Sequence, residues 1–157
     1  MGGYLKRFTD TILKNRLNSS GAVLIQGPKG CGKTETAVQM AKSTARMDVD
    51  DDIRVRMEID PKSVLEGPVP RLIDEWQEYP QIWNYIRRAV DDRQTKGQFI
   101  LTGSANPEER ARLHSGAGRF SIIKMGPPAA LTVIRANGFA CRRKDGVNVT
   151  PLSALTA

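Results

Sequence analysis

The chain has 157 residues, the size of one globular domain, and is long enough to bury a core without disulfides or a structural metal. Its two cysteines, Cys31 and Cys141, match neither a disulfide framework nor a zinc-ligand spacing. No run approaches the roughly 20 apolar residues of a membrane span, so we expect a reduced, cytoplasmic protein without a membrane segment. The net charge of +7 is concentrated in residues 119–157, which gives little support to nucleic-acid binding by the body of the chain.

The N-terminal part of the chain predicts a helix followed by a strand. Apolar residues recur at three- and four-residue steps over residues 4–17, which is typical of an amphipathic helix. We expect residues 1–20 to form this helix and to pack it on the core. The apolar run of residues 22–25 then predicts a buried strand over 22–26.

The segment that follows, residues 27–34, has the sequence GPKGCGKT and matches the phosphate-binding pattern G-x-x-x-x-G-K-T, the P-loop. Glycines let the backbone curl so that its N–H groups face an anion. Lys33 reaches the β- and γ-phosphates, and the Thr34 hydroxyl is a ligand for Mg²⁺. A helical pattern over residues 33–46 completes the strand–loop–helix context. The residues expected to bind the nucleotide are Gly27, Pro28, Lys29, Gly30, Cys31, Gly32, Lys33, Thr34 and Glu35.

Residues 48–66 predict a connection, a strand and a short helix. The acidic run at 48–52 is typical of a solvated connection. Apolar and charged residues alternate over 53–59, which predicts a strand with one covered face. Asp60 and Pro61 are typical of a helix N-cap and first turn, so we expect a short helix to about residue 66.

A second informative stretch begins at residue 69 and ends in two adjacent carboxylates, Asp74 and Glu75. A short apolar strand that ends in such a pair, downstream of a P-loop, is the Walker B pattern. The carboxyl ends of parallel strands share one edge of a sheet. We therefore expect Asp74 to hold Mg²⁺ and Glu75 to polarise the attacking water. A strand followed by a solvated acidic turn is the alternative.

The next segments predict a helix over 81–95 and a fully apolar strand at 99–101. A polar residue at the tip of this strand is placed to touch a γ-phosphate or the attacking water. Ser104 is our choice for that residue and Thr102 the alternative. A hydroxyl that only bonds turn backbone is a third possibility.

Asn106 and Pro107 are typical of the start of another helix, and residues 120–123 predict a last strand. Arg119 begins this strand, and we expect it at the same end of the sheet as the P-loop. It is either an arginine finger or γ-phosphate sensor, or an ordinary surface arginine.

Taken together, four segments resemble the AAA-14 family of bacterial and archaeal P-loop ATPases, which are of the AAA+ type and usually carry a C-terminal domain of the DUF4143 type. The segments are GAVLIQGPKGCGKT from Gly21, PRLIDEWQE from Pro70, GQFILTGSA from Gly97 and HSGAGR from His114. The similarity covers about residues 4–125. It implies an α/β, three-layer P-loop NTPase fold of the ASCE type, with a five-stranded parallel sheet flanked by helices. It further implies Walker A after strand one, Walker B on strand three and sensor 1 after strand four, and it strengthens the roles of Glu75, Ser104 and Arg119.

The chain departs from this pattern after about residue 125. We expect residues 21–125 to be the ATPase core and residues 126–157 to be a divergent basic tail with little order. We expect a truncated or frameshifted reading frame after about residue 125, and a genuine short variant with a disordered tail is the alternative. Translation of the neighbouring DNA in the other two frames distinguishes them, because a frameshift predicts a family-like continuation.

The sequence therefore predicts an ATP-binding protein of the AAA+ type that hydrolyses ATP with Mg²⁺. A non-catalytic nucleotide-binding remnant is the alternative, because no helical lid is recognisable after residue 125. A P-loop small-molecule kinase is a third interpretation, against which the Asp74–Glu75 pair argues. A protein partner or a second copy of the chain is compatible with the sequence, which does not indicate the process served.

Overall fold

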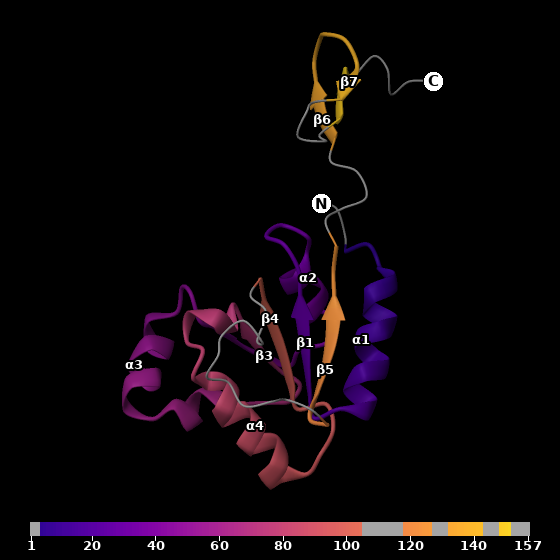
Figure 1. The fold of residues 1–157 in the computed structure, drawn as a ribbon. Coiled ribbons are helices and arrows are strands. Elements are labelled where there is room, and N and C mark those ends of the chain that lie inside the picture. The colour runs from indigo at the N-terminus through magenta and orange to yellow at the C-terminus, as the bar shows by residue number, and fades with distance from the viewer. Residues whose placement is uncertain (1–3, 105–117, 127–131, 143–147, 152–157) are drawn as a thin grey trace. The chain divides into compact units, whose positions relative to one another are not determined.

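The computed structural model describes residues 4–104, 118–126, 132–142 and 148–151 (Figure 1). The chain forms two compact units, Met1–Met125 and Gly126–Ala157. Within the described residues, no helix is both long enough and apolar enough to cross a membrane.

The first unit is built on a five-stranded sheet in which every pair of neighbouring strands is parallel. The strand order is β2-β3-β4-β1-β5. The strands are β1 (Ala22–Gln26), β2 (Ser43–Arg46), β3 (Arg71–Asp74), β4 (Phe99–Gly103) and β5 (Phe120–Lys124). This confirms the predicted α/β fold with a five-stranded parallel sheet.

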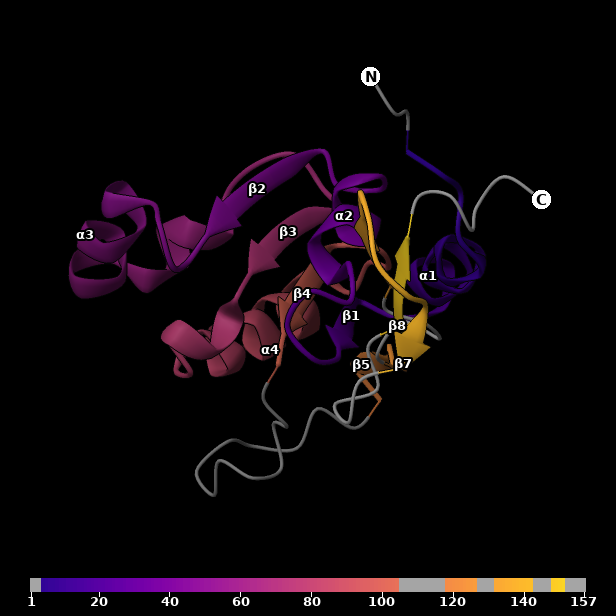
Figure 2. The same ribbon diagram turned by 90° about the horizontal axis from the view of Figure 1, so that it is seen from above.

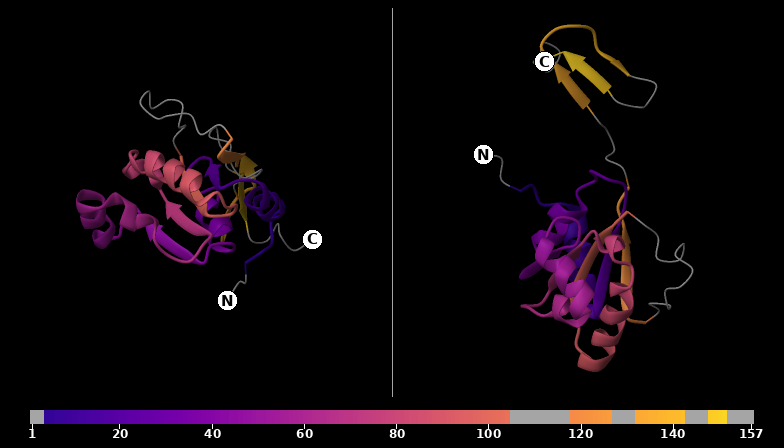
Figure 3. Two further views of the ribbon diagram at one scale, coloured as in Figure 1. Left: turned by 90° about the horizontal axis from the view of Figure 1, so that it is seen from below. Right: turned by 90° about the vertical axis from the view of Figure 1, so that its left-hand side faces the viewer.

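Helices cover both faces of the sheet, as expected where parallel strands are buried on both sides (Figures 2 and 3). One face packs on α1 (Phe8–Ser19) and α2 (Lys33–Val38). The other face packs on α3 (Asp51–Ile59), the 3₁₀ helix η1 (Pro61–Leu65) and α4 (Ile82–Arg93). A second 3₁₀ helix, η2 (Trp76–Glu78), follows β3 directly.

The prediction of one helix over residues 33–46 is wrong in its second half. Helix α2 ends at Val38, and Ser43–Arg46 forms β2, which pairs with β3. β2 lies at the edge of the sheet, and among its residues only Ala45 is buried. An edge strand with one buried small residue carries no apolar run, so the local sequence did not distinguish it from a helix.

The predicted strand over residues 53–59 is also wrong, because the segment is helix α3. Ile53 and Met57, four residues apart, are buried on one helical face, whereas Val55 is 48% and Ile59 80% exposed. Asp51 and Asp52, taken for a solvated connection, lie in the first turn. Acidic residues are favourable there because they face the positive end of the helix dipole.

The remaining predicted elements of this unit lie close to their expected positions. Helix α1 begins later than residue 4 and buries Leu13 and Leu17. The side chain of Asp60 accepts a hydrogen bond from the backbone N–H of Lys62 at 3.1 Å, as a helix cap does, although the element it caps is 3₁₀. The helix predicted to begin at Asn106 lies outside the described residues.

The second unit contains a three-stranded sheet of order β6-β8-β7. Its strands are β6 (Thr132–Arg135), β7 (Cys141–Arg142) and β8 (Asn148–Pro151), with β6 and β8 parallel and β7 antiparallel to β8. The sequence analysis expected little order in this tail. Strands of two to four residues are too short for a hydrophobic period to be recognised, although Thr, Val and Ile favour strands.

Candidate functional site

The P-loop connects the carboxyl end of β1 to α2. Gln26 stands in register with Gly103 of β4 and Lys124 of β5, so the loop begins where three neighbouring strands end. The Gly27 amide donates to the Gly103 carbonyl at 3.3 Å. A Cβ atom on Gly27 would lie 2.5 Å from the Met125 carbonyl oxygen, so the close approach of these backbones requires glycine.

Lys33 is the first residue of α2, and its side chain folds back onto the loop. Its Nζ donates to the Gly27 carbonyl at 2.9 Å and to the Pro28 carbonyl at 3.0 Å. The residue is only 5% exposed. An ammonium group held by two neutral carbonyls lies beside a loop whose glycines Gly30 and Gly32 have positive φ. This is the curled backbone that the motif predicted.

Asp74, at the end of β3, contacts Thr34 of the P-loop directly. The Thr34 hydroxyl donates to Asp74 Oδ1 at 2.8 Å, across 40 residues of sequence. Thr102, at 0% exposure, also donates its hydroxyl to Asp74 Oδ1. Asp74 itself is 7% exposed. The sheet thus brings one carboxylate and two hydroxyls together from α2, β3 and β4.

Glu75 follows Asp74 in a left-handed backbone conformation, with φ 53° and ψ 48°. A non-glycine residue in this region costs of order 1–3 kcal/mol and persists where its surroundings hold it. Two contacts hold Glu75: its amide donates to Thr102 Oγ1 at 3.3 Å, and its carboxylate accepts a hydrogen bond from Gln77 Nε2. The turn directs the main chain away from β3 immediately after Asp74.

The two hydroxyls considered for the tip of β4 occupy different environments. Ser104 is exposed, beyond the end of the strand. Thr102 is buried and contacts both Asp74 and the Glu75 amide. The structure therefore links the alternative, Thr102, to Asp74 and Glu75. The sequence analysis did not anticipate these contacts for either hydroxyl.

The expected position of Arg119 is wrong. β5 runs parallel to β1 and pairs Phe120 with Ala22, so Arg119 lies at the amino ends of the strands, opposite the P-loop. Its guanidinium forms an ion pair with Asp91 of α4. That hydrogen bond raises the pKa of Arg119. Arg119 does not join the cluster around Asp74 in its own chain.

Two residues near the site were missed by the sequence analysis. Gln77 holds the Glu75 carboxylate, and Arg7 donates Nη1 to the Gly32 carbonyl at 3.2 Å. Gln77 lies two residues after Glu75, and this short sequence separation is a signal that the two side chains can contact each other. Arg7 lies 25 residues before Gly32, and no local pattern indicates their contact.

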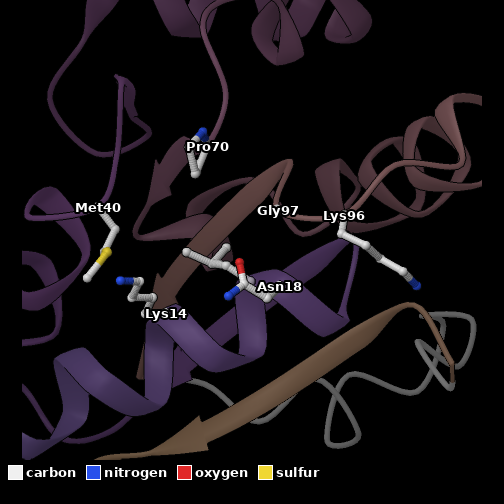
Figure 4. Close-up of a pocket in the computed structure, with 7 residues that line it drawn as sticks. Lys14, Asn18, Met40, Pro70, Lys96 and Gly97 are labelled. Carbon is white, nitrogen blue, oxygen red and sulfur yellow. The ribbon is translucent and has the colours of Figure 1, made fainter.

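A pocket of about 360 Å³ lies elsewhere on this unit (Figure 4). Pro70 and Gly97, which line it, precede β3 and β4, so the pocket lies toward the amino ends of the strands. Lys14, Asn18 and Lys96 line it with exposed side chains. It is separate from the P-loop and Asp74.

Comparison with known proteins identifies a family for this chain. The family model AAA_14, described as an AAA domain, matches residues 19–130. Two curated relatives, the uncharacterized proteins Rv2008c of Mycobacterium tuberculosis and Mb2031c of Mycobacterium bovis, are each 28% identical over 117 residues. The aligned region covers 72% of this chain and 26% of each relative, so the chain spans about a quarter of their length. Because the family model covers most of the chain and the sheet has the expected form, the chain belongs to the AAA_14 family of nucleotide-binding, ATPase-like AAA domains.

Proposed function

We propose that this domain binds ATP together with Mg²⁺ and hydrolyses it. The observation that carries the proposal is the 2.8 Å hydrogen bond between the Thr34 hydroxyl and Asp74, beside the Lys33 ammonium on the P-loop. Three groups that serve metal and phosphate binding in P-loop ATPases are thus gathered at one edge of the sheet.

The side chains present fit a magnesium ion. Asp74 and Thr34 offer hard oxygen donors, which Mg²⁺ prefers. No cluster of three or more His, Cys, Asp or Glu side chains occurs within the described residues, so the other ligands would come from phosphate and water. Bound Mg²⁺ would supply charge neutralisation at the phosphate oxygens.

The residues of the chain have distinct tasks in this reaction. Lys33 exchanges its two carbonyl partners for phosphate oxygens, and the loop amides bind the phosphate chain. Glu75 accepts a hydrogen bond from the attacking water and orients it in line with the γ-phosphate. Thr102 acts on Asp74 as a positioning residue, because its buried hydroxyl donates to Asp74 Oδ1, the same oxygen that accepts from Thr34.

A nucleotide-binding domain without turnover is the second candidate. The observation that favours it is the location of Arg119, which pairs with Asp91 at the opposite end of the sheet. If an arginine is needed to stabilise the transition-state charge, Arg119 would serve only the site of a second copy. In that case a single copy of the chain would bind nucleotide without repeated turnover.

The experiment is nucleotide binding and steady-state phosphate release by the 157-residue chain, over a range of protein concentrations. We expect multiple turnovers with Mg²⁺ and none after chelation. Lys33→Ala is expected to abolish ATP binding, while Lys42→Ala, at an exposed position just beyond α2, is the matched control. Stoichiometric binding without repeated turnover would favour the second candidate, and equal ATP binding by wild type and Lys33→Ala would refute both.

A further inference from the structure

Two basic side chains contact the P-loop, and only one belongs to the loop. Lys33 donates to the Gly27 and Pro28 carbonyls, and Arg7 donates to the Gly32 carbonyl. Within the described part of the chain, neither takes part in an ion pair. Two cations that donate these hydrogen bonds to neutral carbonyls concentrate positive potential at the loop, which attracts an anion.

The backbone of Arg7 is fixed by the start of α1. Its amide donates to Asp10 Oδ2 at 2.7 Å, and its carbonyl accepts from the Asp10 amide at 3.1 Å. Asp10 is 3% exposed and also accepts from the Tyr4 hydroxyl at 2.5 Å. Leu13 is buried in the same core cluster as Val23 of β1 and anchors the helix. These contacts present the Arg7 side chain to the loop from a rigid element.

The guanidinium lies directly on Gly32. A Cβ atom on Gly32 would fall 1.9 Å from Arg7 Nη1, so the guanidinium fills the space of the missing side chain. The Arg7 guanidinium also lies over the Tyr4 ring, with its carbon 5.7 Å from the ring centroid. Arg7 is nevertheless exposed, so a solvent-borne anion can approach its remaining N–H groups.

We propose that Arg7 is a phosphate-binding residue of the nucleotide site, taking a phosphate oxygen of a bound nucleoside di- or triphosphate as a partner. An N–H bond to a phosphate oxygen is charge-assisted and about twice as strong as one to a carbonyl. The inference rests on the proposed function of the P-loop. The matched family model begins at residue 19, so Arg7 lies outside the matched segment and is a contribution of the N-terminal helix of this chain.

The test compares the dissociation constants of ADP and ATP for the 157-residue wild type, Arg7→Ala, Arg7→Gln and Arg16→Ala. Arg16 is an exposed arginine in the last turn of the same helix and serves as the matched control. The helix-capping contacts of residue 7 use its backbone and survive all substitutions. Arg7→Gln retains an N–H donor for the Gly32 carbonyl but removes the charge. Thermal unfolding without nucleotide reports any loss of structure.

We expect both Arg7 variants to weaken ADP and ATP binding by about tenfold, the range for an exposed charge-assisted contact. Arg16→Ala should bind like wild type. The nucleotide affinity of both Arg7 variants should also fall less steeply with added salt than that of wild type, because one phosphate-contacting cation is missing. Wild-type affinity in Arg7→Gln, or weakening matched by an equal loss in Arg16→Ala, would overturn the role of Arg7 while leaving the P-loop proposal intact. Failure of wild type to bind nucleotide would instead overturn the proposed function, and the role of Arg7 with it.

Discussion

The two ends of the parallel sheet both carry buried polar side chains, but they hold them in different ways. At the amino ends, Arg71 donates to the Val64 carbonyl at 2.7 Å and to Ser43 Oγ at 3.0 Å, and Gln98 donates to the Thr95 carbonyl at 2.9 Å. These are separate contacts that tie one element to its neighbour. At the carboxyl ends, the polar groups instead converge on one carboxylate.

The convergence of polar groups on Asp74 distinguishes the candidate functional site at the carboxyl ends from the structural contacts at the amino ends. Asp74 Oδ1 accepts hydrogen bonds from the hydroxyls of Thr34 in α2 and Thr102 in β4. The Thr102 hydroxyl oxygen in turn accepts a hydrogen bond from the Glu75 amide. Such a cluster restricts the geometry of every member at once, which a metal or phosphate site requires. Removal of a group at the carboxyl ends should therefore change chemistry, whereas removal at the amino ends should change stability.

Glu75→Gln is expected to have the largest effect. It replaces the carboxylate that orients water with a neutral amide, so turnover should fall by about 10²–10³-fold while ATP affinity stays near that of wild type. Steady-state phosphate release and a binding titration measure the two quantities. Glu78→Gln, at an exposed position in η2, is the control. Equal turnover by Glu75→Gln and wild type would end the assignment of Glu75.

Arg71→Ala tests the amino end. It leaves the Val64 carbonyl without its buried donor and opens a space beside Gly67, whose Cβ position lies 2.6 Å from Arg71 Nη1. We expect a loss of about 2–3 kcal/mol in the free energy of unfolding, measured by denaturant titration. Folded protein should keep its ATP affinity. A loss no greater than that of Arg54→Ala, an exposed arginine of α3, would contradict this role.

Thr102→Val should have a smaller, mixed effect. The substitution keeps the shape but removes the hydroxyl that contacts Asp74 and the Glu75 amide, so we expect about 1–2 kcal/mol of destabilisation and about tenfold slower turnover. Thr102→Ser keeps the hydroxyl and should keep wild-type turnover, although loss of the buried methyl group costs about 1 kcal/mol of stability. Ser104→Ala compares the other candidate at the tip of β4. A larger loss of turnover in Ser104→Ala than in Thr102→Val would return the role to Ser104.

Arg119→Ala should have the smallest effect. Arg119 lies at the amino ends of the strands and its ion pair with Asp91 is partly solvated, so ATP affinity and the denaturation midpoint should stay near their wild-type values. The comparison is made at low protein concentration, where a second copy does not contribute. A strong loss of turnover under those conditions would show that the two ends of the sheet are coupled.

The sequence predicted the fold well where burial and motif spacing determine it. The apolar runs that became β1, β3 and β4 are continuous because these strands are covered on both faces. Lys33, Thr34 and Asp74 followed from the motifs, because the end of each parallel strand leads to the same edge. Parallel topology also required Arg119, which precedes a strand, to lie at the other edge.

The remaining errors have a tertiary origin. Ser43–Arg46 becomes a strand by pairing with β3, and its sequence contains little apolar surface to indicate this. The apolar residues of 53–59 fit the two-residue period of a strand, and some of them also fit the four-residue spacing of a helix. In the structure the segment is a helix, in which Ile53 and Met57 are buried in the core. The contact of Arg7 with Gly32 depends on where α1 docks, which no short-range pattern specifies.

The aromatic cluster beyond β3 has a practical consequence. The chain has two tryptophans, and both lie in this cluster: Trp76, next to Glu75, has its ring centroid 5.3 Å from that of Trp83, which stacks on Phe120 at 4.0 Å. Trp76 is fully buried, and its Nε1 lies 2.7 Å from the position of a Cβ on Gly103. One of the two tryptophans, Trp76, therefore emits from beside the turn at Glu75, and the other, Trp83, contacts it. The unlabelled chain carries its own optical reporter of any movement there.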